Sequence, residues 1–248
     1  MTFKDHFSDQ ASDYARYRPN YPHELFAYLG SLVLARECAW DCGTGSGQAA
    51  VALAEFFDRV VATDASEKQI LSATKSPRVE YRIAPAENSG LSSHSLDLIA
   101  VAQALHWFDL DAFYMEAKRV LKPDGILAVW CYGLLEIGPE IDAIISRLYR
   151  EIVGPYWPPE RKVIESRYQT IPFPFAELQP PQFTMETHWS LAQLVGYLRT
   201  WSATRAFIVA TRTDPIEEII SDLSTAWEKQ DRERLISWPL SIRAGRVS

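Results

Sequence analysis

A glycine-rich stretch near the start of the chain, residues 41–47, constrains the fold most strongly. It consists of Asp41-Cys42-Gly43-Thr44-Gly45-Ser46-Gly47. An apolar run precedes it at residues 38–40, and a helix-like run follows it at residues 48–57. Glycines at alternate positions let a backbone turn sharply and approach a ligand where a Cβ would collide. The free N–H groups of a helix that starts there suit a nucleotide-like or carboxylate-bearing ligand. The stretch therefore predicts a strand, a ligand-binding turn and a helix.

An acidic residue, Asp64, ends the next apolar run. This spacing is typical of the acid that holds ribose hydroxyls in dinucleotide-binding folds. Asp64 could instead cap the following helix, but Ser66 already fits that role. The spacing therefore favours a ligand contact for Asp64.

The first half of the chain alternates between strand-like and helix-like segments. Strands are expected at residues 38–42, 59–63, 79–83, 96–102 and 126–130, with helices at 48–57, 67–74 and 111–121. A turn at residues 122–125, Lys122-Pro123-Asp124-Gly125, ends the third helix and leads into the fifth strand. Alternating βα units predict an α/β fold with a doubly wound, mostly parallel sheet that binds its ligand at the carboxyl ends of the strands.

The second half predicts a different arrangement, with an inserted lid before the chain returns to the sheet. A helix is expected at 139–153, a rigid break at 154–159, a strand at 183–189, helices at 191–202 and 215–229, and a strand at 238–243. Pro239 would restrict this last strand to a sheet edge. We expect a helical lid at 1–34, the cofactor-binding core at 35–135, a proline-rich helical cap at 136–181, and strands and helices that complete the sheet at 182–248.

Composition narrows the possible partners. The 248 residues are 47% hydrophobic and carry a net charge of −7, which argues against general nucleic-acid binding. Three cysteines without metal-type spacing indicate reduced thiols and no metal site. No apolar run has membrane-spanning length, and no signal peptide is recognisable at the start. We expect a cytoplasmic enzyme, a monomer or homodimer, that acts on a small molecule and binds neither nucleic acid nor membrane.

The glycine-rich stretch, Asp64 and the turn at 122–125 together resemble class I S-adenosylmethionine-dependent methyltransferases. The third glycine lies one position earlier than in the G-x-G-x-x-G of nicotinamide enzymes, which disfavours a nicotinamide-dependent oxidoreductase. Segments at 7–22, 103–108 and 197–202 resemble a narrower subgroup, the methyltransferase type 11 or trans-aconitate methyltransferase-like enzymes. The resemblance implies a Rossmann-like seven-stranded sheet with an inserted, mainly helical lid. It also implies S-adenosylmethionine as cofactor and S-adenosylhomocysteine as product.

The resemblance also implies roles for individual residues. The glycine-rich loop would pass the methionine part of the cofactor, Asp64 would accept the ribose hydroxyls, and Ala65 would lie against the adenine. Pro85 stands where many relatives have an acid, which puts recognition of the adenine amino group in doubt. The cofactor-binding residues implied are Tyr14, Arg18, Asp41, Gly43, Thr44, Gly45, Gly47, Asp64, Ala65, Ala86, Glu87 and Gln103.

The substrate side is less constrained. His106 follows the fourth strand and could serve as a general base or as a structural histidine. Tyr21, Trp107 and Trp157 are expected to line the acceptor pocket. The expected reaction is methyl transfer to a carboxylate or hydroxyl oxygen of a small metabolite. The alternative from another class is a regulatory module that binds the cofactor without catalysis.

Overall fold

Strands and helices alternate through the first half of the chain in a computed structural model, which describes residues 19–229 and 231–247. The strands are β1 (Cys38–Cys42), β2 (Arg59–Asp64), β3 (Val79–Ile83), β4 (Leu96–Ala102) and β5 (Leu121–Tyr132). The helices are α2 (His23–Leu32), α3 (Gln48–Leu53), α4 (Glu67–Ser72) and α5 (Leu110–Val120), with a short 3-10 helix η1 (Leu105–Trp107) after β4.

The second half contains most of the remaining helices. They are α6 (Pro139–Arg147), α7 (Arg161–Glu165), α8 (Leu191–Arg199), α9 (Ser202–Thr211) and α10 (Ile220–Trp227). Short helical turns are η2 (Leu148–Ile152), η3 (Gly154–Tyr156) and η4 (Pro215–Glu218). The strands are β6 (Ala176–Glu177), β7 (Thr184–Trp189) and β8 (Arg234–Arg246).

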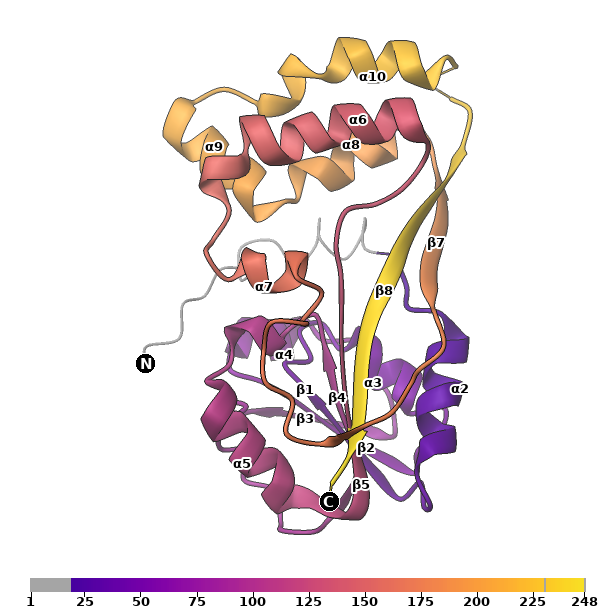
Figure 1. Cartoon of the computed structure of the whole chain (residues 1–248), viewed down its shortest axis with the longest axis vertical. Helices are drawn as coiled ribbons and strands as arrows, with labels where there is room; N and C mark the ends of the chain where they lie inside the picture. Colours follow the sequence, from indigo (N-terminus) through magenta and orange to yellow (C-terminus); the bar gives the residue numbers. More distant parts are fainter. Residues whose placement is uncertain (1–18, 230, 248) are drawn as a thin grey trace.

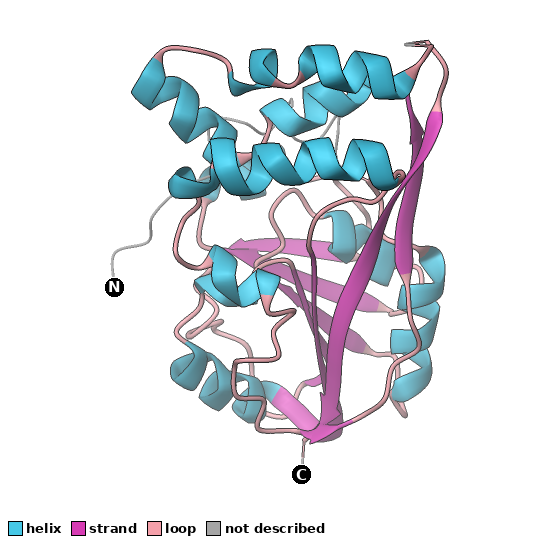
Figure 2. Ribbon diagram, turned by 45° about the horizontal axis from the view of Figure 1, so that its top comes forward, coloured by secondary structure: helices cyan, strands magenta, loops and turns pink. Residues whose placement is uncertain are grey.

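The described strands form one eight-stranded sheet. Seven of them follow the path β3-β2-β1-β4-β5-β8-β6, and β7 pairs with β8 beside this path. The pairs among β1 to β5 are parallel, and β8 runs antiparallel to β5. Figure 2 shows the sheet below the helices of the second half. The predicted doubly wound, mostly parallel α/β fold is confirmed.

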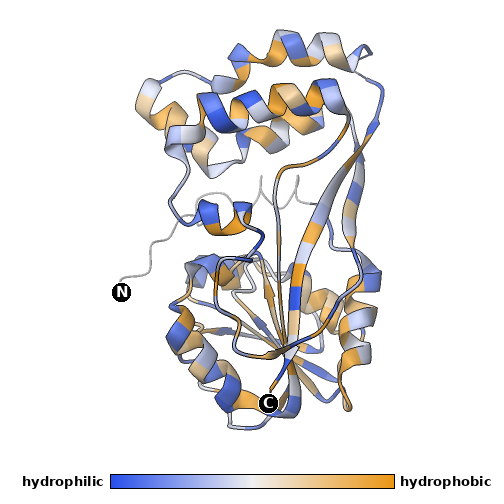
Figure 3. Cartoon of the chain, viewed as in Figure 1, coloured by the Kyte–Doolittle hydropathy of each residue, from blue (hydrophilic) through white to orange (hydrophobic). Residues whose placement is uncertain are grey.

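Two hydrophobic cores lie on opposite faces of the sheet. One contains Leu25 of α2 and Leu53 of α3, and the other contains Phe113 and Val120 of α5. Apolar residues alternate with polar ones along α2 and α5, which therefore present one buried face each to the strands (Figure 3). The strands between these helices are apolar on both faces, as a sheet covered on both sides requires.

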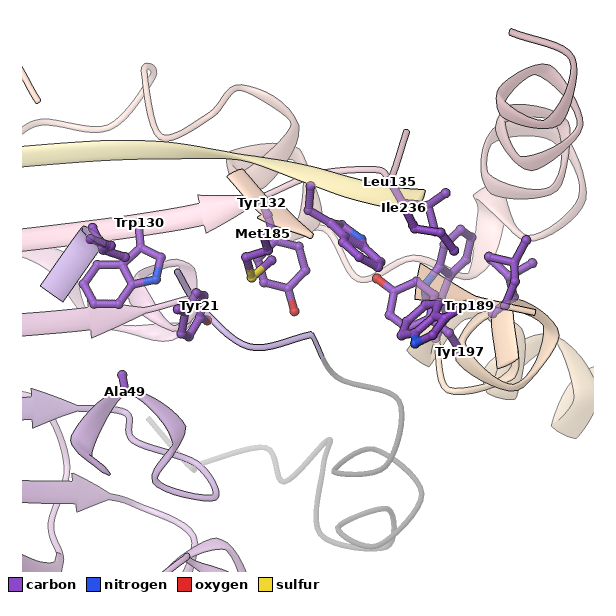
Figure 4. Close-up of a cluster of buried hydrophobic side chains, with 14 of the residues drawn as sticks. Tyr21, Ala49, Trp130, Tyr132, Leu135, Met185, Trp189, Tyr197 and Ile236 are labelled. Atoms are coloured by element: carbon purple, nitrogen blue, oxygen red, sulfur yellow. The ribbon is translucent and has the colours of Figure 1, made fainter. Parts of the chain in front are cut away.

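A helical layer made of α6, α8, α9 and α10 covers the end of the sheet toward which β5 runs (Figure 1). β8 connects this layer to the core because residues 240–246 pair with β5, whereas residues 234–239 pair with β7. Buried side chains continue without a break from Trp130 in the core to Trp189 and Tyr197 near the helical layer (Figure 4). The segments 136–181 and 182–248 both contribute helices to this layer, since α10 packs against α6 and α8.

The prediction of an edge strand at 238–243 is wrong. β8 lies between β5 and β6, so the strand is interior. Pro239 is tolerated because it is exposed and lies where β8 exchanges β7 for β5 as its partner. The helix predicted at 191–202 ends earlier, at Arg199, and a second helix, α9, begins at Ser202 after the extended residue Trp201.

The predicted turn at 122–125 is a bulge inside β5. Leu121 pairs with Leu96 and Ile126 with Leu98, so the four residues between them are looped out of the ladder. Lys122 in this bulge donates from Nζ to Asp97 at 2.8 Å, and Asp97 accepts the backbone N–H groups of Glu37 and Cys38. The bulge thereby ties β5 to the starts of β4 and β1.

Candidate functional site

The glycine-rich loop joins β1 to α3 at the carboxyl edge of the sheet. The backbone N–H groups of Gly43 and Thr44 both donate to the Thr63 carbonyl at 2.9 Å, which fixes the loop to β2. Thr44 Oγ1 donates to Asp41 Oδ2 at 2.5 Å, and Asp41 is fully buried. These hydrogen bonds to β1 and β2 therefore fix the shape of the turn.

Its three glycines all have positive φ angles, and each has different surroundings. A Cβ on Gly47 would lie 2.2 Å from the Tyr81 hydroxyl, and one on Gly43 would lie 2.6 Å from the Cβ of Ala104. A Cβ on Gly45 would meet nothing closer than Gln69 Oε1 at 3.9 Å. The loop is thus closely packed at both ends and open at Gly45, where a ligand can approach the backbone.

Asp64 ends β2 beside this opening. Its Oδ2 accepts the Gly45 N–H at 2.9 Å, and its Oδ1 accepts the Ser66 N–H at 2.8 Å. Ser66 in turn caps α4 by accepting from Gln69 N, as predicted. The side chain of Asp64 is therefore fixed in orientation, and each carboxylate oxygen can accept more than one hydrogen bond.

Two further acids lie at the same edge. Burial raises the pKa of the Cys42 thiol, and the carboxylates of Asp41, Glu87 and Asp64 raise it further, so all three act on the end of β1. Glu87 Oε1 also accepts the Asp109 N–H at 2.9 Å, which ties this loop to the start of α5. Of the predicted adenine contacts, Ala86 is buried beside Glu87, and Ala65 is half-buried between Asp64 and Ser66.

Gln103 occupies the corresponding position after β4. Its Nε2 donates to the Tyr132 carbonyl at 3.2 Å, and its Oε1 accepts the Tyr132 N–H at 2.9 Å. The side-chain amide thus continues the ladder between β4 and β5 beyond the backbone of Gln103, whose φ is 56°. Gln103 stands at the predicted edge, with its side chain held by the sheet.

His106 lies in η1, next to Gln103 and the glycine-rich loop in the fold. Its Nδ1 is 3.1 Å from the Tyr168 hydroxyl, and its ring centroid lies 4.7 Å from that of Trp107, with the two rings tilted by 47°. Burial, and to a lesser extent the charge of Arg161, lowers the pKa of His106 to about 3. The imidazole is therefore neutral at physiological pH and a much weaker base than an exposed histidine.

Tyr168 is a site residue that sequence reasoning missed. Burial raises its pKa well above the usual value, so its hydroxyl keeps its proton. The protonated hydroxyl can donate to His106 Nδ1, an arrangement in which the imidazole proton is on Nε2. A single tyrosine in a proline-rich segment carries no sequence signal for such a contact.

Arg243 of β8 was missed as well. Its Nη1 donates to the carbonyls of Tyr168 and Ile171, both at 2.8 Å, and its guanidinium lies 4.7 Å from the Phe173 ring centroid. Tyr168 has a φ of 58°, a left-handed conformation that non-glycine residues rarely adopt. Arg243 holds this conformation in place and so positions the Tyr168 hydroxyl.

The predicted pocket residues lie at three places around this edge. Tyr21 packs edge-on against Trp130 at 5.6 Å (Figure 4), and Trp107 lies beside His106. Trp157 lies in the segment between α6 and α7, where its ring packs at a tilt against Tyr149 with centroids 4.9 Å apart. The predicted contacts of Tyr14 and Arg18 lie outside the described residues.

Comparison with known proteins agrees with this geometry. A family profile described as "Methyltransferase domain" matches residues 40–129, from β1 into β5. A Dictyostelium discoideum protein that bears the name of a methyltransferase is 40% identical over 233 residues, covering 92% of this chain and 89% of that protein.

Solved structures give the same result. One from Anaeromyxobacter dehalogenans, named a type II methyltransferase, is 48% identical, covers 92% of this chain and 97% of its own, and superposes with a TM-score of 0.88. A phosphoethanolamine N-methyltransferase 2 from Haemonchus contortus, in complex with phosphomonomethylethanolamine and S-adenosylhomocysteine, shares the fold at 16% identity. It covers all of this chain and 61% of its own, with a TM-score of 0.51.

Proposed function

The chain belongs to the S-adenosylmethionine-dependent methyltransferases, and on that premise we propose that it methylates a carboxylate or hydroxyl oxygen of a small metabolite. This assignment excludes the nicotinamide-dependent oxidoreductase that was considered from the sequence.

The loop and the acids at the carboxyl edge fit the cofactor. The open side of Gly45 would let the amino-acid part of the cofactor run along the backbone, and Asp64 would accept the ribose hydroxyls. The acids near Cys42 would favour a ligand with positive charge. When bound, S-adenosylmethionine supplies a methyl group on a positively charged sulfonium, which is already a good leaving group.

The low basicity of His106 supports a carboxylate in preference to an amine as the methyl acceptor. An amine reaches the enzyme protonated and needs a base to free its lone pair, and an imidazole with a pKa of about 3 is a poor base. A carboxylate needs no base, because its lone pairs are available at neutral pH. In this proposal the neutral imidazole of His106 donates a hydrogen bond from Nε2 and orients the acceptor oxygen.

The chain would promote the reaction mainly by positioning and by exclusion of water. The acceptor oxygen would attack the methyl carbon in line with the bond to sulfur, whose electron pair stays on sulfur as that bond breaks. Carboxylate attack releases no proton, whereas a hydroxyl would have to give its proton to water, because His106 is a poor base. The helical layer above the sheet edge would limit the acceptor to a small molecule (Figure 1).

We also propose that the enzyme is a cytoplasmic monomer or homodimer whose partner is a free small molecule, not nucleic acid or membrane. Cys38, Cys42 and Cys131 are free thiols, which fits a reducing compartment. The acidic net charge of −7 would repel a nucleic-acid backbone. None of the described helices combines the length and apolar character needed to cross a bilayer.

Calorimetric titration with S-adenosylhomocysteine tests the cofactor site. We expect saturable binding by the full chain and a loss of at least about tenfold in Asp64→Ala, which removes the proposed acceptor of the ribose hydroxyls. Glu67→Ala, which removes an exposed acid at the start of α4, should bind as the wild type does. Equal affinity of the Asp64 variant and the wild type would contradict the assigned role.

Methyl transfer from labelled S-adenosylmethionine tests the acceptor. Carboxylic acids, phenols, alcohols and amines of similar size are compared, and carboxyl products are identified by their base-labile ester. We expect labelled oxygen products. Label found in amines alone would overturn the oxygen assignment, and cofactor binding without any product would favour the regulatory module.

A further inference from the structure

The guanidinium of Arg161 occupies an unusual place for a charged group. α7, which begins at Arg161, lies between the helical layer and the core (Figure 1). The guanidinium carbon is 4.7 Å from the ring centroid of Trp157 and 5.4 Å from that of Tyr149, and Nε donates to the Tyr149 hydroxyl at 2.8 Å. Two rings and one hydrogen bond therefore fix its orientation.

In the part of the chain that the structure describes, this half-buried cation has no direct counter-ion. Within residues 19–229 and 231–247, no ion pair joins Arg161 to a carboxylate. The nearest acid in the network, Glu165, accepts from the Tyr149 hydroxyl at 2.7 Å and so reaches Arg161 only through that hydroxyl. The Nη groups of Arg161, which match the two oxygens of a carboxylate, have no hydrogen-bond acceptor among these residues.

Arg161 also lies close to the proposed reaction centre. α7 packs against η1, which carries His106, and Tyr168 just beyond α7 contacts the His106 ring. The charge of Arg161 acts on both His106 and the Cys131 thiol of β5. Arg161 therefore faces the same edge of the sheet as the acceptor.

Charge is divided along this edge. Burial raises the pKa of both Cys42, at the end of β1, and Cys131, near the end of β5. The carboxylates of Asp41, Glu87 and Asp64 raise the pKa of Cys42 further, whereas the charges of Arg161 and Arg167 lower that of Cys131. Only β4 separates these two strands, so the acidic groups near β1 and the basic groups near β5 lie one strand apart along the edge. A cationic cofactor suits the acids, and its sulfonium would then approach a second cation unless an anion lies between them.

We propose that Arg161 binds a carboxylate of the methyl acceptor and thereby selects small carboxylic acids. The inference rests on the proposed function and narrows it to one substrate class. Bidentate pairing with the guanidinium would fix the acid, and the rings of Trp157 and Tyr149, over which the guanidinium lies, would hold it in place before the acid binds. The bound anion would also offset the repulsion between Arg161 and the sulfonium.

Binding to protein saturated with S-adenosylhomocysteine tests this directly, without need for turnover. The probes are acetate, succinate, tricarballylate, benzoate and phenylacetate, each compared by calorimetry with its amide, and inorganic phosphate. We expect at least one acid to bind at least tenfold more tightly than its amide and more tightly than phosphate. If no acid exceeds its amide, or if phosphate binds best, the proposal is overturned.

Variants then assign the preference to Arg161. Arg161→Gln should lose the acid preference by tenfold or more while its affinity for S-adenosylhomocysteine stays within about twofold of the wild type. Lys162→Gln removes the same charge from an exposed neighbour and should keep the preference. An Arg161→Gln variant that binds the acid like the wild type would overturn the proposal.

Arg161→Lys is a milder variant that avoids a folding defect, because it keeps the positive charge and removes only the paired N–H donors of the guanidinium. It should bind the acid several-fold more weakly than the wild type, and unchanged affinity would overturn bidentate binding. Loss of S-adenosylhomocysteine binding in the wild type would instead contradict the proposed function, so the two failures are distinguishable.

Discussion

At the scale of single residues, Gly47 and Gly45 illustrate two different reasons why one loop requires glycine. Both have left-handed φ angles, 85° and 55°, but only at Gly47 would a Cβ collide with Tyr81. Gly45→Ala should therefore destabilise the protein by about 1–2 kcal/mol through backbone strain alone. Gly47→Ala should cost about 1–3 kcal/mol more, because the Tyr81 ring must also move.

Urea denaturation of the ligand-free protein measures both values. In a Tyr81→Ala background the additional cost of Gly47→Ala should disappear, leaving only the backbone strain. An equal loss of stability in the two single variants would show that packing against Tyr81 is not what requires glycine at position 47.

His106 predicts a pH dependence of stability. Its pKa falls from 6.5 in the unfolded chain to about 3 in the fold, so below pH 6.5 the unfolded chain binds more protons. Stability is therefore unaffected by this group above pH 6.5 and declines as the pH falls through that value. Relative to His106→Asn, the wild type should lose on the order of 1 kcal/mol between pH 7 and pH 5.5.

The measurement is the urea midpoint of both proteins at several pH values. His23→Asn, which changes an exposed histidine, should follow the wild type. Parallel curves for the wild type and His106→Asn would show that the fold does not oppose protonation of His106. Because the imidazole stays neutral, methyl transfer should also lack an ionisation near pH 6.5 that depends on His106.

At the scale of elements, the segment between α7 and β6 depends on Arg243. This side chain reaches two carbonyls of the segment, Tyr168 and Ile171, and pairs with Glu177 in β6. Arg243→Met should lower stability by about 2–4 kcal/mol, because buried carbonyls lose charge-assisted hydrogen bonds. It should also make residues 161–175 more accessible to protease and weaken the contact of Tyr168 with His106.

Limited proteolysis followed by mass spectrometry locates the first cuts. Arg232→Met, which alters a side chain that is 63% exposed, provides the matched control and should show the wild-type pattern. If Arg243→Met shows no new cuts in this segment, the segment is held by its own packing and not by β8.

The elements differ in how far the sequence could predict them. The strands β1, β3 and β4 have the predicted bounds. β1 and β4 are short, mostly apolar runs of the kind that specify buried parallel strands, whereas β3 alternates apolar and polar residues at the end of the sheet. Pairing across the chain is not specified in this way. β6 has two residues and follows no pattern, so the interior place of β8 and the role of Pro239 could not be found from periodicity.

The same distinction holds at the site. The glycine-rich loop and Asp64 are local signals, since each follows its own strand, and both lie at the expected edge. The partners of His106 are not local, because Tyr168 is 62 residues away and is itself held by Arg243, 75 residues further on. The setting of Arg161 has no local signal either, since the rings beside it, Tyr149 and Trp157, belong to preceding turns of the chain.

At the scale of the whole molecule, the core and the helical layer should unfold together. They share β8, and one hydrophobic cluster runs through both. Far-UV circular dichroism and tryptophan fluorescence should therefore give coincident thermal transitions. The fluorescence reports on both halves, since Trp40 and Trp130 lie in the core and Trp189 and Trp227 near the helical layer. Two resolved transitions would show that the layer is a separate folding unit.

The late position of β8 also bears on synthesis of the chain at the ribosome. β5 emerges about a hundred residues before its antiparallel partner, so one side of its hydrogen-bonding groups stays unpaired while the helices of the second half are made. An exposed apolar strand edge is a template for association with other chains. Nascent chains stalled before residue 234 should therefore require chaperones, whereas chains released after β8 should not.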